Sequence, residues 1–431
     1  MPTTDETLSA LRRGDLAGAR ELRFPDGLSA FPSEILALGE TLEILDLGAG
    51  GLTDLPAELG RLRRLRILFC SGNRFERLPE VLGECPELSQ IGCRGAGLRE
   101  VPGASLPPRL RWLTLTDNAI ESLPDEIGER PLLQKLMLAG NRLAVLPPAL
   151  AGATNLELIR LAANRLERLP DWLAEMPRLA WIAYAGNPGE PALPATPMPD
   201  VDWSELAPGR LLGEGASGRT FAATWRRGEA REEVALKLFR GAMTSDGLPE
   251  REMAACLAAG AHPHLAGGLG RIVGHPQRAS GLVMPLLPSH WRPLAAPPSQ
   301  ASCSRDVYES GQLFGRDVAL GLARAAASAA AHLHARGLLH GDLYAHNLLW
   351  DGETGAAVLS DFGAAGALPA GAAGEAFQRL ETRAWSILFG ELLDRLDEDP
   401  DGDLLRLKEA CLQPDVTARP LMAEVLARLT A

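Results

Sequence analysis

The sequence predicts an α/β solenoid of short repeated units followed by an α+β domain, on the basis of three observations. Leucines recur through the first half of the chain at intervals of 23 residues, with one interval of 22. Proline is dense between residues 188 and 199, and because proline cannot donate to a sheet ladder, this stretch marks a boundary between domains. After residue 203, runs typical of strands come first, and Ala- and Leu-rich runs typical of helices follow.

Length, charge and cysteine content limit what the chain can be. Its 431 residues exceed one typical hydrophobic core, so two domains are expected. The formal net charge of −12 argues against nucleic acid or an anionic membrane as the partner. The start of the chain contains acidic residues and no apolar run, unlike a secretion signal, and no uninterrupted apolar stretch is long enough to span a membrane. With six cysteines and no C-x-x-C pair, we expect a reducing, cytoplasmic setting, although export without a cleaved signal leaves no mark in a sequence.

Each repeat follows the frame L-x-x-L-x-L-x-x-N-x-L, and a Leu-Pro pair comes after most copies. One copy contains Leu110, Leu113, Leu115, Asn118 and Ile120. So many copies at one period resemble the leucine-rich repeat family, in which each L-x-L is a short strand stacked on the next coil. The resemblance implies a horseshoe-shaped solenoid over residues 19–187. A short helical cap over 1–18 would precede it, and a proline-rich linker over 188–202 would follow.

Two positions of the frame carry structural expectations. The asparagine turns the chain and satisfies backbone groups between coils, so its ladder should be weakest where Gly50 and Ala96 replace it. Cys70 and Cys93 occupy the same position in adjacent copies. We expect both to be small buried apolar side chains rather than reactive thiols.

The outward positions of the repeated strands line the concave face, which binds partners in this architecture. They are Asp46, Phe69, Arg94, Trp112, Met137, Arg160 and Trp181. Because aromatic side chains beside arginines suit a protein interface, we expect a protein partner or substrate at Phe69, Trp112, Met137 and Trp181. The alternative is that the two tryptophans only cover neighbouring coils.

The second half opens with Gly213, Gly215 and Gly218 in the pattern G-x-G-x-x-G. In a dinucleotide site a helix follows such glycines, whereas here a strand-like run, a charged turn and Val-Ala-Leu-Lys ending at Lys237 follow. This succession of strands around a glycine loop is the arrangement that covers nucleotide phosphates.

Further along, His-Gly-Asp-Leu-Tyr-Ala-His-Asn ends at Asn347, and Asp-Phe-Gly begins at Asp361. Phosphoryl transfer from a Mg-nucleotide requires a carboxylate that accepts the proton of the attacking hydroxyl, here Asp342, and oxygen ligands for the metal. These motifs, in this order over about 150 residues, resemble the protein kinase superfamily, whose domain is two-lobed. The kinase-like domain would cover 203–431.

The resemblance implies ATP and Mg²⁺ as cofactors and assigns roles to residues. Lys237 would hold the phosphates and pair with a glutamate of the next helix, Glu252, with Glu250 as the alternative. Asp342 would be the catalytic base, and the metal ligands would be Asn347 and Asp361. The nucleotide would contact Gly213, Gly215, Gly218, Thr220, Ala235, Lys237, Met284, Pro285, Leu287 and Leu349.

The chain departs from kinases around its catalytic motif. Gly341 stands where kinases have an arginine that receives an activation-loop phosphate. Residues 364–380 contain no Ser, Thr or Tyr, so we expect no phosphorylation of this segment. Tyr344 replaces the lysine of Ser/Thr kinases.

The C-terminal part of the chain resembles protein kinases less closely. Trp385 and Arg419 lie in stretches that resemble later kinase motifs, but no A-P-E triplet occurs. Glu381, or else Glu375, would therefore pair with Arg419. Arg383 stands where an aspartate is expected, two residues before Trp385.

The leading hypothesis is an ATP- and Mg²⁺-dependent Ser/Thr-type protein kinase whose repeats recruit a protein partner or substrate. One alternative is a nucleotide-binding pseudokinase scaffold, which Tyr344 favours. Another is a small-molecule phosphotransferase, since His-Gly-Asp also occurs in antibiotic-kinase relatives. Because the activation segment has no phosphorylation switch, the solenoid could instead regulate the kinase.

Overall fold

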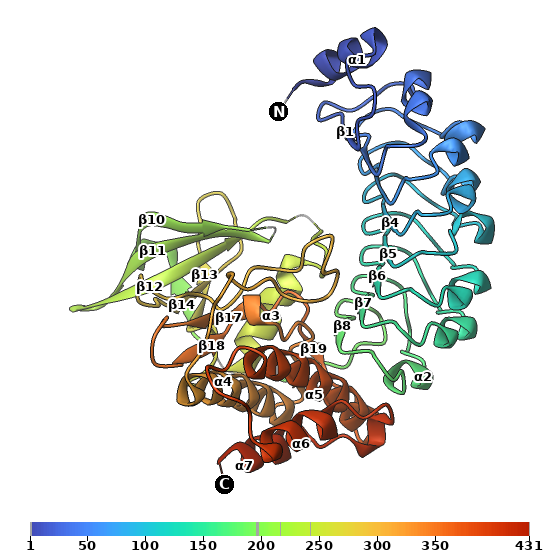
Figure 1. The fold of residues 1–431 in the computed structure, drawn as a ribbon. Coiled ribbons are helices and arrows are strands. Elements are labelled where there is room, and N and C mark those ends of the chain that lie inside the picture. The colour runs from blue at the N-terminus through green and yellow to red at the C-terminus, as the bar shows by residue number, and fades with distance from the viewer. Residues whose placement is uncertain (1, 195–197, 216, 242, 431) are drawn as a thin grey trace. The chain divides into compact units, whose positions relative to one another are not determined.

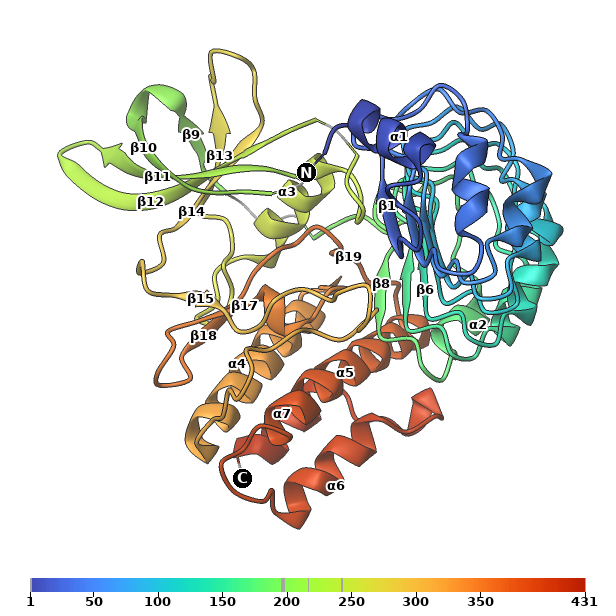
Figure 2. The ribbon, with the colours of Figure 1, turned by 45° about the horizontal axis from the view of Figure 1, so that its top comes forward.

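The computed structural model describes residues 2–194, 198–215, 217–241 and 243–430. These residues form two compact units, Met1–Pro170 and Asp171–Ala431 (Figures 1 and 2). The division comes before the last coil of the repeat, which we define as residues 171–187, so this coil is grouped with the α+β part. The domain boundaries given by the sequence stay a prediction.

The strands of the first unit form a parallel ladder in which equal positions of the frame face each other. Leu45 pairs with Leu68, and Leu68 pairs with Ile91; all three are buried. The strands are β1 (Glu21–Arg23), β2 (Ile44–Asp46), β3 (Ile67–Phe69), β4 (Gln90–Gly92), β5 (Trp112–Thr114), β6 (Lys135–Met137) and β7 (Leu158–Arg160). The predicted solenoid is confirmed.

Short 3₁₀-helices return the chain on the side of each coil away from the strands (Figure 1). Each begins directly after a proline, whose fixed φ and missing N–H suit the start of a helix, which explains the recurring Leu-Pro pair. They are η1 (Ser33–Leu38), η2 (Ala57–Arg61), η3 (Glu80–Glu84), η4 (Gly103–Ser105), η5 (Asp125–Glu129) and η6 (Pro148–Gly152).

Helix α1 (Thr4–Arg13) precedes the first coil and is stabilised at its start by a capping box between Thr3 and Glu6. Thr4 and Asp26 exchange two hydrogen bonds of 3.0 Å, which attach the helix to the first coil. The cap predicted from the leucine spacing is therefore helical.

The asparagine of each frame joins one coil to the coil before it. The amide of Asn141 donates to the carbonyls of Leu115 and Leu138, both at 2.9 Å, and its oxygen accepts from the Ile120 N–H at 3.1 Å. Gly50 replaces an asparagine where a Cβ would lie 2.4 Å from the Leu28 carbonyl oxygen. The close approach of two backbones therefore excludes any side chain at that position.

Cys70 and Cys93 are both fully buried, as expected, but they form a disulfide with Cα atoms 5.1 Å apart. The expected burial of both side chains is confirmed, but their pairing was not predicted. The cause is the one-to-one register, which places equal positions of neighbouring copies next to each other.

Removing an interior asparagine should destabilise the solenoid. Asn141→Ala leaves the buried Ile120 N–H without its partner and removes one of two amide donors to each of two buried carbonyls, so we expect the free energy of unfolding to fall by roughly 2 kcal/mol. Asn155→Ala, which removes one exposed hydrogen bond to Pro131, is the control and should cost under about 0.5 kcal/mol. Urea unfolding of both variants measures the difference, and equal losses would contradict this role.

The second unit begins with the last coil, which contains α2 (Asp171–Ala174) and β8 (Trp181–Ala183). A six-stranded sheet follows, in the order β10-β11-β12-β14-β13-β9, packed on a core that includes Val201, Trp225, Val234 and Val283. Its strands are β9 (Asp200–Asp202), β10 (Leu206–Glu214), β11 (Gly218–Arg227), β12 (Ala230–Phe239), β13 (Gly270–Val273) and β14 (Gly281–Pro285). The end of the predicted linker is thus a strand of this sheet. Short η7 (Trp203–Glu205) and helix α3 (Pro249–Ala259) complete this lobe.

The other lobe is mainly helical (Figure 2). Its long helix α4 (Arg316–Ala335) buries a face of alanines, and the indole of Trp385 donates to the Ala323 carbonyl at 3.0 Å. The remaining elements are β15 (Arg292–Pro293), β16 (Leu338–Leu339), η8 (Ala345–Asn347), β17 (Leu348–Trp350), β18 (Ala357–Leu359), β19 (Gly366–Ala367), α5 (Ala372–Leu393), α6 (Gly402–Cys411), η9 (Val416–Ala418) and α7 (Met422–Thr430). In the described part of the chain, no helix has both the length and the apolar character needed to cross a membrane.

Three histidines gather where the loop after α3 meets α4. The ring of His262 stacks on that of His332 with centroids 4.6 Å apart, and His264 lies 5.7 Å away. Burial, together with the two neighbouring imidazoles, lowers the pKa of His262 to about 4 from its ordinary 6.5.

This cluster should make stability depend on pH. The unfolded chain binds a proton at His262 more readily than the folded chain does. The stability that neutral His262 contributes to the folded state is therefore present above pH 6.5 and is lost as pH falls toward 4. We expect His262→Gln to flatten the loss of urea midpoint between pH 6.5 and 4. The exposed His290→Gln should keep the wild-type pH dependence, and parallel curves for all three proteins would contradict the assignment.

Candidate functional site

A cavity of about 460 Å³ lies in the second unit, between the six-stranded sheet and the strands β17 and β18. It brings together residues that are far apart in the sequence. The predicted nucleotide contacts and metal ligands in its wall are Thr220, Ala235, Lys237, Met284, Pro285, Leu287, Leu349 and Asp361. Strand pairing explains part of this, since Ala235 of β12 faces Met284 of β14.

Some wall residues were not predicted. Leu212 directly precedes Gly213, and Ser360 directly precedes Asp361, so adjacency to a motif could have indicated both. Ala266 also lines the cavity, but it adjoins none of the predicted site residues in the sequence. Within the described residues, the other predicted site residues are not in the wall: Gly213, Gly215, Gly218, Glu252, Asp342 and Asn347.

The glycine loop joins β10 to β11. The Gly215 N–H donates to the Gly218 carbonyl at 2.9 Å. A Cβ at Gly218 would lie 2.2 Å from the Leu238 carbonyl oxygen, so packing on β12 requires this glycine. At Gly213 and Gly215, in contrast, an added Cβ would meet no described atom within 4 Å. Packing inside the described protein does not account for those two glycines.

Lys237 and Glu252 form an ion pair at the edge of the cavity, with side chains 18% and 6% exposed. Burial opposes the charge of Lys237, but Glu252 and Asp361 outweigh it and hold the pKa of Lys237 above its ordinary value. Glu250, the alternative partner, is exposed. The structure therefore pairs Lys237 with Glu252.

The two acidic motifs are joined through Asn347. Its amide donates to the backbone carbonyl and the carboxylate of Asp342, at 2.9 Å and 2.7 Å. Its own carbonyl accepts from the Ser360 N–H at 2.8 Å, next to Asp361. His340, fully buried, also contacts the Ser360 carbonyl at 3.0 Å through Nε2. Hydrogen bonds thus join Asn347 to Asp342 and to Ser360, the residue just before Asp361.

Steric crowding explains why position 341 is a glycine. Its φ is +74°, and a Cβ there would lie 2.3 Å from the Ile182 carbonyl oxygen and 2.8 Å from that of Ala364. The arginine of kinases therefore cannot occupy this position.

Glu381 has a different partner from the one expected. Its buried carboxylate accepts from the Gly341 N–H and contacts His334 Nε2, both at 2.7 Å. Burial raises the pKa of Glu381, but the contact with His334 and the other favourable interactions outweigh it and lower the pKa overall. Glu381 therefore supports, from α5, the loop of residues 340–347, which we call the catalytic loop after its proposed role. The expected pair of Glu381 with Arg419 is wrong.

Arg419 is fully buried and donates to backbone carbonyls instead of a glutamate. Its guanidinium reaches the carbonyls of Gln413 at 2.7 Å, Pro177 at 2.6 Å and Arg379 at 3.4 Å. Pro177 belongs to the last coil, so this coil supplies one of the carbonyls to which Arg419 donates.

The predicted partner face is only partly available. Trp181 is 1% exposed, because its ring stacks on Tyr344 with centroids 4.2 Å apart and planes 5° from parallel. Met137 is also buried. Trp112 is half-buried, with its indole N–H bonded to Thr114 at 2.9 Å and the Lys135 ammonium 4.1 Å from its ring. The expected exposed position is therefore wrong for Trp181, for Met137 and for Arg160, which is 2% exposed.

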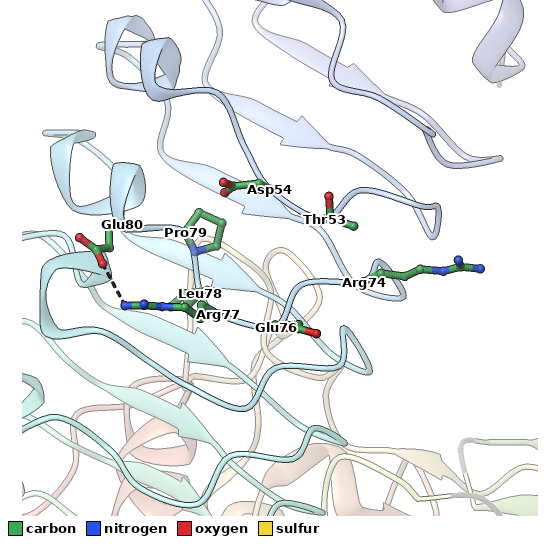
Figure 3. Close-up of a pocket in the computed structure, with 8 residues that line it drawn as sticks. All are labelled: Thr53, Asp54, Arg74, Glu76, Arg77, Leu78, Pro79 and Glu80. Atoms are coloured by element: carbon green, nitrogen blue, oxygen red, sulfur yellow. Dashed lines mark hydrogen bonds and ion pairs between the residues drawn. The ribbon is translucent and has the colours of Figure 1, made fainter.

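A second hollow, of about 490 Å³, lies on the first unit among residues 53–80 (Figure 3). Within its lining Arg77 forms an ion pair with Glu80 at 3.1 Å, and Arg77 also contacts Glu100, outside the lining, at 3.2 Å. Exposed ion pairs of this kind are ordinary surface features and need no ligand.

Comparison with known families agrees with this geometry. A model of the protein tyrosine and serine/threonine kinase family matches residues 206–377, and a leucine-rich repeat model matches residues 108–166. The chain carries leucine-rich repeats and a protein kinase domain. The predicted fold class, a repeat solenoid followed by a two-lobed kinase-like domain, is confirmed, and a kinase domain implies ATP and usually Mg²⁺.

Curated relatives share only parts of their length with this repeat–kinase chain. Human PH domain leucine-rich repeat-containing protein phosphatase 1 is 34% identical over 92 residues, which cover 21% of this chain and 5% of that protein. Mouse podocan is 32% identical over 143 residues, covering 32% of this chain and 22% of podocan. A leucine-rich repeat protein of Leptospira interrogans, of solved structure, has a TM-score of 0.38 and 24% identity, covering 43% of this chain and 53% of its own.

Breaking the ion pair of the kinase domain should cost stability. Glu252→Gln removes the carboxylate paired with the mostly buried ammonium of Lys237 and leaves Asp361 as its acidic neighbour among the described residues, so we expect the free energy of unfolding to fall by roughly 2 kcal/mol. Glu250→Gln, an exposed position two residues away, is the matched control, with an expected change under about 0.5 kcal/mol. Chemical unfolding measures both; an unaffected Glu252→Gln protein would contradict the pairing.

Proposed function

We propose that the kinase domain is an active ATP- and Mg²⁺-dependent protein kinase of the Ser/Thr type. The observation that carries the proposal is the Lys237–Glu252 ion pair at the edge of a cavity that Asp361 also lines. A buried lysine held charged beside a cavity of this volume suits the binding of nucleotide phosphates.

The walls of the cavity suit the rest of a nucleotide. Ala235 and Leu349 offer apolar surface from opposite lobes to a flat purine. Met284, Pro285 and Leu287 lie along one edge, where backbone carbonyls and N–H groups can recognise the base. At Gly213 and Gly215 the described protein leaves space, and a backbone without side chains there allows close approach of phosphates.

The proposed metal ligands fit Mg²⁺ by their chemistry. Asp361 and Asn347 supply a carboxylate and an amide oxygen, which are the hard oxygen ligands that Mg²⁺ prefers. When bound, Mg²⁺ would neutralise the charge that develops on the phosphates. Asn347 also holds the Asp342 carboxylate, which orients it to accept the proton of a substrate hydroxyl.

The Ser/Thr specificity and the recruitment of a protein partner are further parts of this proposal. Within the repeat region, Phe69 and Trp112 are partly exposed on the strands and suit a protein contact. The role of the repeats rests on the leucine-rich repeat match and on these side chains.

One observation favours a second candidate, a nucleotide-binding pseudokinase. Tyr344 occupies the position of the usual lysine and is 5% exposed under the ring of Trp181. A cation that could steady the transferred phosphate is therefore missing from that position.

Transfer of label from γ-labelled ATP with Mg²⁺ to the chain itself and to a generic protein substrate distinguishes the two. We expect transfer by the wild type, and a loss of at least about hundredfold in Asp342→Asn, because the proton acceptor is removed. Asp399→Asn, an exposed aspartate of the same domain, should keep the wild-type rate. Phosphoamino-acid analysis of the product should give phosphoserine or phosphothreonine.

Absence of transfer with nucleotide still bound would make the pseudokinase the better account. Label on tyrosine alone would contradict the Ser/Thr assignment.

A further inference from the structure

The last coil contacts the catalytic loop on the C-terminal side of Asp342. The indole N–H of Trp181 donates to the Leu343 carbonyl at 3.0 Å, and its ring covers Tyr344. The guanidinium of Arg305, from the segment before α4, lies 5.6 Å from the centre of the same ring. Trp181 and Tyr344 are 1% and 5% exposed, so this contact excludes water almost completely.

The same coil contacts the loop on the N-terminal side of Asp342. The Ile182 carbonyl lies so close to Gly341 that no side chain fits there. Glu381 of α5 also contacts this residue, because its carboxylate accepts from the Gly341 N–H. Asp342 is therefore flanked by two residues, Gly341 and Leu343, whose backbones both contact the last coil.

A third contact reaches the segment after Asp-Phe-Gly. The Tyr184 hydroxyl donates to the Ala367 carbonyl at 2.8 Å, and its ring lies 5.6 Å from that of Phe377 in α5. Tyr184 is 3% exposed. Residues 364–380 contain no Ser, Thr or Tyr, so phosphorylation within this segment cannot fix its position.

A fourth contact connects the coil to helix α3. The carboxylate of Glu190, just after the coil, accepts from the Gly186 N–H at 2.7 Å and from the Ala367 N–H at 3.5 Å. It also forms an ion pair of 3.5 Å with Arg251, which is the neighbour of Glu252 in α3. The Glu190 side chain is 3% exposed. One buried carboxylate thus links the coil, the segment after Asp-Phe-Gly and the helix that carries the partner of Lys237.

We propose that the last coil and Glu190, just after it, form a positioning element of the kinase domain, in which Trp181, Tyr184 and Glu190 hold the catalytic loop and helix α3 in their working arrangement. This inference rests on the proposed function. Trp181 acts through Leu343 and Tyr344 and touches no reacting atom, so it is a positioning residue. The chain would then be constitutively competent, with no need for phosphorylation of its activation segment.

Substitutions in the full-length chain test this proposal. Trp181→Leu removes both the stacking and the donated hydrogen bond, and we expect kcat to fall on the order of tenfold to hundredfold, because Asp342 loses its alignment. The KM for ATP should stay within about threefold, since Trp181 does not line the cavity. Trp181→Phe keeps an aromatic ring on Tyr344 and should recover part of kcat.

Trp172→Leu is the matched control, since Trp172 is a half-buried tryptophan of the same coil, on α2. It should keep kcat near the wild-type value. Each kcat is divided by the fraction of protein that binds ATP, so that unfolded molecules do not count as slow ones. An unchanged kcat in Trp181→Leu, or a loss that this fraction accounts for entirely, would overturn the proposal.

Amide hydrogen exchange of the same proteins separates this proposal from the proposed function. Trp181→Leu should speed exchange across residues 341–347, and Tyr184→Phe should speed it across 364–368, while Trp172→Leu leaves both unchanged. If the wild type transfers no phosphate, the proposed function fails, but faster exchange still supports the positioning role. Unchanged exchange in Trp181→Leu would overturn that role whatever the activity.

Discussion

The parallel stacking of Trp181 on Tyr344 is the contact on which the arrangement of the catalytic loop depends. It places an aromatic ring from a repeat coil against the residue two positions after Asp342, and the indole N–H fixes the carbonyl of Leu343 between them. Aromatic stacking of buried rings contributes about 0.5–1.5 kcal/mol beyond the area it buries. That energy is small beside the stability of a domain, but it acts directly on the backbone that carries the proposed base.

The unusual residues of the catalytic motif follow from this packing. A side chain at position 341 would collide with the Ile182 carbonyl, so the last coil and the arginine of kinases exclude each other. Glu381 and the last coil then hold Gly341 from two directions, and Pro177 provides an acceptor for Arg419. Features that look like losses in the sequence are therefore replaced by contacts with a repeat coil.

Motif order and repeat period predicted the fold, because the leucine frame recurs at a fixed spacing and the kinase motifs follow one another in a fixed order. The Lys237–Glu252 pair and the cavity wall around Ala235 and Leu349 were predicted for the same reason. The contact of Trp181 with Leu343 was not, since it joins residues 162 positions apart and has no sequence pattern. The partner of Glu381 was also mistaken, because a buried carboxylate pairs with whichever donor the fold brings near it, here the Gly341 N–H and His334.

A double-mutant cycle on kcat tests most directly whether the last coil acts through the catalytic loop. The proteins are the wild type, Trp181→Leu, Tyr344→Leu and the double variant, all as full-length chains. If the two rings act as one unit, the double variant should lose no more than about twofold beyond the worse single variant, since the contact is already broken. Losses that multiply would show that the two residues act independently, and would contradict the account.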